Sequence, residues 1–89
     1  MELFQQRAQW PHTVGDITKS LDGVWGVVGA TDSNGNLHRL ERSLKPPTTY
    51  KITEYKGEDE SAIEKETHFE ETQREEAVKQ FAKSIGFAV

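Results

Sequence analysis

The stretch GVWGVVGATDSNGNLHRLERSL, residues 23–44, decides the fold that this sequence predicts. At its centre, Asn34 and Gly35 can both take the positive φ angles of a type I′ turn, a turn that commonly joins two antiparallel strands. Residues typical of β-strands flank the pair on both sides. The stretch therefore predicts a β-hairpin.

The length of this turn determines which hairpin side chains face the core. A loop of two residues pairs Gly29 with Leu40, Val27 with Arg42 and Trp25 with Leu44. Alternate residues of a strand face opposite sides of a sheet, so this register predicts four side chains on one face. They are Trp25, Val27, Leu40 and Leu44. A bulged turn would shift the register by one residue.

Helices are expected before and after the strands. Residues 12–23 predict a short helix, because Thr13 can cap it and apolar residues then recur at near-helical spacing. Residues 73–85 predict a longer helix, because Thr72 and Glu75 fit a capping box and Gly86 suits the C-terminal cap. Its apolar stripe consists of Ala77, Val78, Phe81, Ala82 and Ile85.

Two further strands are expected between the hairpin and the last helix. Residues 48–57 predict a third strand, with Tyr50 and Ile52 on one face and Tyr55 on the other. Residues 62–71 alternate in polarity and favour a fourth strand, although a helix beginning at a Ser61/Glu64 capping box is the alternative. In the strand, one face carries Ile63, Lys65, Thr67 and Phe69, and the other carries Glu64, Glu66, His68 and Glu70.

These elements together predict a small α+β protein with a single domain over residues 1–89. We expect an antiparallel sheet of three or four strands, with the C-terminal helix packed on one face and a short N-terminal helix. A chain of 89 residues with 34% hydrophobic content suffices for one core. No apolar run approaches the about 20 residues that span a bilayer, and the start lacks a leader pattern, so we expect no membrane contact and a cytoplasmic location.

Acidic residues are concentrated in residues 54–76, which hold ten of the fifteen acids and three of the eleven bases. Such an excess attracts basic partners and repels phosphates. We therefore expect a non-enzymatic protein–protein interaction module, a small regulator or inhibitor that binds a protein partner with a basic surface. The expected partner-binding residues are Glu64, Glu66, Glu70, His68 and Tyr55, on an open sheet face that residues 1–21 would otherwise cover.

A nucleic-acid-binding module is the alternative. A basic patch on the second and third strands could hold phosphates, with Tyr50 or Tyr55 stacking on bases; its residues are Arg39, Arg42, Lys45 and Lys51. The order helix, strands, helix also resembles the double-stranded RNA-binding domain in outline. That family places basic residues at the start of its last helix, where this chain has Glu75 and Glu76, so the acidic charge disfavours nucleic acid.

A small enzyme is the third and least favoured interpretation. Ser43, His38 and Asp32 can be arranged on paper as a hydrolytic triad, but they belong to one hairpin with no nucleophile elbow. The chain has no cysteine, and its histidines, His12, His38 and His68, lack the close spacing of transition-metal sites. We therefore expect no metal and no cofactor.

Overall fold

The structure is a computed structural model that describes residues 11–87. Its elements, in chain order, are α1 (Val14–Leu21), β1 (Val27–Thr31), β2 (Leu37–Arg42), β3 (Thr49–Tyr55), β4 (Ile63–Glu70), the short 3-10 helix η3 (Glu71–Gln73) and α2 (Arg74–Ser84). The four strands form one antiparallel sheet in the order β1-β2-β3-β4. The prediction of an α+β fold is confirmed, and β4 is a strand rather than a helix.

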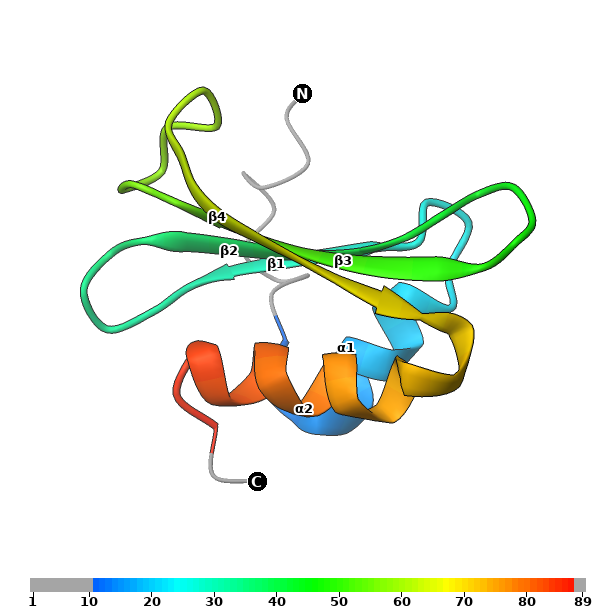
Figure 1. Ribbon diagram of the computed structural model, residues 1–89. Coiled ribbons are helices and arrows are strands. Elements are labelled where there is room, and N and C mark those ends of the chain that lie inside the picture. Colours follow the sequence, from blue (N-terminus) through cyan, green and yellow to red (C-terminus); the bar gives the residue numbers. More distant parts are fainter. Residues whose placement is uncertain (1–10, 88–89) are drawn as a thin grey trace.

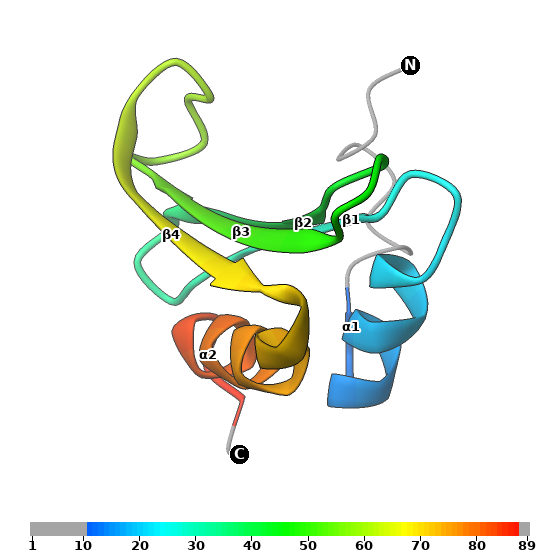
Figure 2. The same ribbon diagram turned by 45° about the vertical axis from the view of Figure 1, so that its right-hand side comes forward.

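Both helices lie on the same face of the sheet (Figures 1 and 2). The core between them is closed by apolar side chains from every layer: Ile17, Leu21, Val28, Leu40, Tyr50, Ile52, Phe69, Ala77, Val78, Phe81 and Ala82. Phe81, in the middle of α2, is fully buried, as the predicted apolar stripe requires. We call the sheet surface that faces away from both helices the outer face.

The start of α1 follows directly from local sequence. The Thr13 hydroxyl accepts a hydrogen bond from the Asp16 backbone N–H at 3.1 Å, and the Asp16 carboxylate accepts from the Thr13 N–H at 3.2 Å. The hydrogen bond from the His12 N–H to the same carboxylate is the main cause that lowers the pKa of Asp16. The predicted cap of α1 is thus confirmed, because a capping box needs only residues three apart.

The predicted start of α2 at residue 73 is within one residue of the observed start, but its predicted cap is wrong. The chain passes from β4 into η3 before α2 begins at Arg74. The Gln73 side chain accepts a hydrogen bond from the Glu70 backbone N–H at 2.9 Å, and this contact takes the place of the expected Thr72/Glu75 box. The helix therefore starts where β4 turns back toward the core.

The predicted register of the β1–β2 hairpin is wrong by one residue: Val28, not Gly29, pairs with Leu40. The Asp32 carboxylate accepts hydrogen bonds from the backbone N–H groups of Asn34 and Asn36, at 2.8 and 3.0 Å. These bonds stabilise a longer turn in which Gly35 alone has positive φ, at 82°. The alternative of a bulged turn is the one that the structure adopts.

Three apolar side chains of the predicted core are exposed: Trp25, Leu44 and Ile63. Of these, the changed register moves only Trp25, because Leu44 keeps its place relative to Leu40 and lies beyond the end of β2. Val28 and Leu40 are buried, whereas Trp25 and Leu44 are 73% and 65% exposed. On β4, the pairing shifts between the partners of Glu54 and Tyr55, so Ile63 leaves the face that Phe69 shares with the core and is 51% exposed. An irregularity in a strand reverses the face of every residue beyond it.

The outer face is not covered by α1, because α1 lies beside α2 on the core side (Figure 2). The alternative, in which residues 1–21 cover this face, does not hold for α1, and residues 1–10 lie outside the described part of the chain. Neither α1 nor α2 has the length and hydrophobicity of a bilayer-spanning helix, and the described part of the chain contains no other candidate.

Candidate interaction surface

The predicted acidic residues lie on β4, which is an edge strand of the sheet. Phe69 is buried in the core, so its neighbours His68 and Glu70 point to the outer face. Glu66 joins them, because it lies two residues before His68 and pairs with Thr53. Glu64 falls at the shift in pairing and is also exposed. We call Glu64, Glu66 and Glu70 the acidic strip.

Most of the negative charge in residues 54–76 is not neutralised within the described chain. Among residues 11–87, one of its acids contacts an arginine or lysine: Glu60, whose Oε1 lies 2.6 Å from Nη1 of Arg39. In the acidic strip, Glu66 contacts His68 at 3.6 Å, and no ion pair with arginine or lysine is made by Glu64 or Glu70 in this part of the protein. Carboxylates at this density repel one another and attract a cationic surface.

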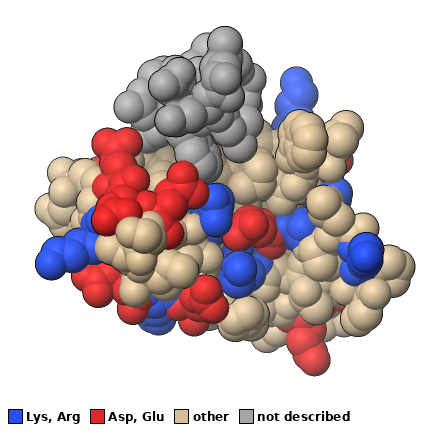
Figure 3. Space-filling view, turned by 90° about the horizontal axis from the view of Figure 1, so that it is seen from above, with Lys and Arg blue, Asp and Glu red and all other residues tan. Residues whose placement is uncertain are grey.

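The charge is unevenly spread over the outer face. Figure 3 shows red groups gathered at the left, over the end of the sheet that carries the β1–β2 and β3–β4 turns, with more blue groups toward the middle and right. The β3–β4 turn itself contributes Glu58, Asp59 and Glu60 to this end. The electrostatic field of the protein is therefore most negative at this end, which favours the approach of a cationic partner in one orientation.

Tyr55 does not present the exposed ring that a binding anchor needs, because it is 2% exposed. The guanidinium carbon of Arg39 lies 5.4 Å from the centre of its ring, within the range of a cation–π contact. Burial raises the pKa of Tyr55. The structure thus groups Glu66, His68 and Glu70 on the surface and separates Tyr55 from them by burial.

The predicted basic patch is mostly engaged within the protein. Arg39 contacts Glu60 and Glu41, and Nζ of Lys51 lies 3.9 Å from Glu41. The Arg42 guanidinium donates hydrogen bonds to the backbone carbonyls of Leu21 and Gly23, at 3.1 and 3.3 Å. Tyr50 and Tyr55, the expected stacking residues, are 4% and 2% exposed. These contacts reduce the support for a nucleic-acid module.

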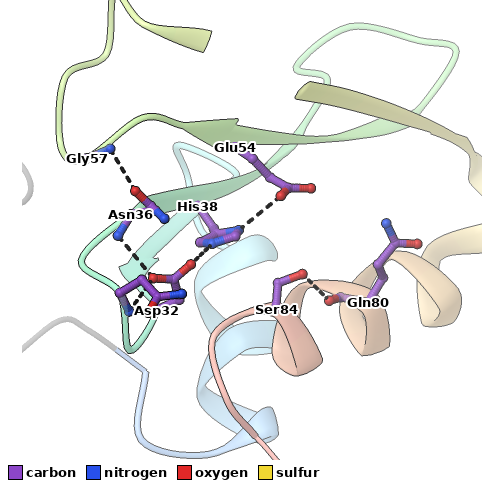
Figure 4. Close-up of polar contacts among 8 residues, drawn as sticks. Asp32, Asn36, His38, Glu54, Gly57, Gln80 and Ser84 are labelled. Carbon is purple, nitrogen blue, oxygen red and sulfur yellow. Dashed lines mark hydrogen bonds and ion pairs between the residues drawn. The ribbon is translucent and has the colours of Figure 1, made fainter. Parts of the chain in front are cut away.

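His38 is a polar residue whose burial the sequence did not predict. It lies between the hairpin turn and the C-terminal end of α2, with Gln80 and Ser84 nearby (Figure 4). Its Nε2 is 2.8 Å from Oδ2 of Asp32, and its Nδ1 is 4.0 Å from Oε1 of Glu54. The hydrogen bond from His38 is the main cause that lowers the pKa of Asp32, assisted by the turn N–H groups.

Two members of the triad considered above are therefore in contact, but the third is not. Ser43 is five positions beyond His38 along the chain, or about 16 Å at the rise of a strand. Its Oγ accepts a hydrogen bond from the Thr49 N–H at 3.0 Å. The same hydroxyl can donate a hydrogen bond to the carbonyl of Lys45 or Pro47. Among residues 11–87, no three acidic or histidine side chains converge as a metal site would require.

In comparisons with known proteins, no family model, curated protein or solved structure matches this chain.

Proposed function

We propose that this protein is a non-enzymatic interaction module that binds a basic surface of another protein through the acidic strip and His68. The observation that supports it most is the exposed set of strip carboxylates, which have no arginine or lysine partner among residues 11–87. Such side chains add little to stability, whereas their common field speeds the encounter with a cationic partner. A cytoplasmic setting stays a prediction from the sequence.

The partner contacts side chains rather than extending the sheet. β4 is an edge, but charged residues along it, including Lys65, oppose the addition of a further strand. Binding through exposed charges is sensitive to salt, because ions screen such charges over about 8–10 Å. The complex should therefore form rapidly at low ionic strength and more slowly as salt is added.

Affinity capture with paired charge variants tests the proposal. Wild-type protein, Glu64→Lys/Glu66→Lys and Glu58→Lys/Glu76→Lys are immobilised and exposed to native lysate in a salt series. The two variants have the same net charge, but only the first reverses the acidic strip. A binding protein retained by the wild type and by the Glu58/Glu76 variant, and lost from the Glu64/Glu66 variant, is the expected result.

Association kinetics with the captured protein then separate steering from anchoring. Reversal of Glu64 and Glu66 should slow association and flatten its salt dependence, while the melting temperature stays nearly unchanged. Equal association rates for the two charge variants would mean that only net charge matters. In that case the acidic strip is a solvated edge and the proposal fails.

A further inference from the structure

An exposed apolar cluster lies at the end of the molecule where α1 joins β1 and β2 joins β3. Val24, Trp25 and Leu44 are 84%, 73% and 65% exposed. The two connections lie together in both views (Figures 1 and 2), and the Arg42 N–H donates to the Gly26 carbonyl at 2.7 Å between them. We call Val24, Trp25 and Leu44 the apolar tip.

The apolar tip has residue types that are unusual in a turn. Val24 and Trp25 are the central residues of a turn closed by the hydrogen bond from the Gly26 N–H to the Gly23 carbonyl, at 3.1 Å. Such positions normally hold Gly, Pro, Asn, Asp or Ser, because these residues fit the backbone and face water. A tryptophan left outside the core of a chain with only 34% hydrophobic residues indicates a role other than folding.

A groove that can receive an aromatic side chain lies on the same molecule. It runs between α1 and the first half of α2, has a volume of about 540 Å³, and is lined in part by Val14, Thr18 and Val78. Arg74 and Lys79 also line it. Glu75 lines it as well, and the Arg74 guanidinium is held by Asp22. Lys79 is therefore the cation best placed to face an indole ring, because the face of the ring attracts positive charge.

The tip and the groove adjoin each other through one ion pair. Nη1 of Arg74, which lines the groove, lies 2.6 Å from Oδ1 of Asp22, which precedes Val24 by two residues. A two-fold axis that passes near this pair would set each tip against the groove of the other copy. An isologous contact of this kind is closed, because both copies use the same surface.

We propose that the protein forms a symmetric homodimer in which Trp25 of each copy enters the α1–α2 groove of the other. Three exposed side chains offer on the order of 400 Å² per copy, and with the groove walls that they cover the dimer buries about 1,000 Å² in total. That area is at the lower end of specific interfaces, so a dissociation constant of about 1–100 µM is expected.

The overall charge of the protein, rather than the charges near the tip, favours a second copy over a lipid surface, because Lys45 beside Leu44 is an exposed cation. Arg42 and Asp22 are engaged within the protein, and the net charge of −4 disfavours an anionic membrane. Glu66 and Glu70 of the acidic strip point to the outer face, away from the helices that form the groove. Two copies can therefore approach without opposing their most acidic surfaces.

Sedimentation of the whole protein from about 1 to 500 µM tests the dimer across the expected range of dissociation constants. Trp25→Ala, which removes the inserted ring, and Thr18→Arg, which fills the groove, should each raise the dissociation constant at least tenfold. Ile63→Ala removes another exposed apolar side chain, 51% exposed and outside the tip, and should leave the dissociation constant unchanged. Circular dichroism verifies that each variant is folded, and Lys79→Glu serves as the groove variant if Thr18→Arg does not fold.

Mixing the two interface variants distinguishes a dimer in which each tip enters the groove of the other copy from a dimer in which the two tips contact each other. The Thr18→Arg copy retains Trp25 and the Trp25→Ala copy retains an open groove, so one contact of the two should re-form and restore part of the association. A mixture no more associated than either variant alone would overturn the proposal. So would wild-type protein that stays monomeric throughout, which would leave the tip to another protein or to lipid.

Discussion

Phe81→Ala should lower the stability of the protein strongly and Trp25→Ala only slightly, although the sequence predicts both rings in the core. Phe81 is 0% exposed and Trp25 is 73% exposed. Loss of a buried phenylalanine removes about 2–3 kcal/mol of transfer free energy. A residual cavity of roughly 50–100 Å³, at about 24 cal/mol per Å³, adds about 1–2 kcal/mol. The free energy of unfolding should therefore fall by about 3–5 kcal/mol.

That loss is most of the stability of a domain this size, for which about 5–8 kcal/mol is expected. The melting temperature should fall by at least about 12 °C for Phe81→Ala. Trp25→Ala should change the free energy of unfolding by less than about 1 kcal/mol. Urea unfolding followed by circular dichroism, at protein concentrations too low for self-association, measures both. A loss below about 1 kcal/mol for Phe81→Ala, or above about 3 kcal/mol for Trp25→Ala, would refute the assigned core.

Three further changes test local features. Thr13→Ala removes the cap of α1 and should cost about 1 kcal/mol in urea unfolding. Gly26→Ala should destabilise more than Gly35→Ala, because both glycines have positive φ but a Cβ at Gly26 would lie 3.2 Å from the Arg42 guanidinium; equal melting temperatures would contradict this. The pKa of Asp32 is lowered on folding, so wild type should be more stable than Asp32→Asn above about pH 4, and lose this advantage as the pH falls through the lowered pKa. Urea midpoints across this pH range test it, and a constant difference would argue against it.

Features that depend on neighbours in the chain could be predicted from the sequence. The capping box of α1 needs Thr13 and Asp16, and the hairpin needs a turn between two strand-forming segments. The alternation on β4 predicted that His68 and Phe69 face opposite sides, as the structure shows. In each case the deciding interaction or periodicity lies within a few residues, so the local sequence contains it.

Features that depend on a contact across the fold were decided by the tertiary structure. In the hairpin, the Asp32 carboxylate closes the longer turn locally, but the packing against both helices favours the resulting register, because it places the paired Val28 and Leu40 in the core. Tyr55 is on the predicted face but lies under Arg39, which is held in turn by Glu60, 21 residues along the chain. Alternation states which way a side chain points and not what covers it. Burial is set by the packing of distant segments, and a one-residue bulge is enough to exchange the two faces of a strand.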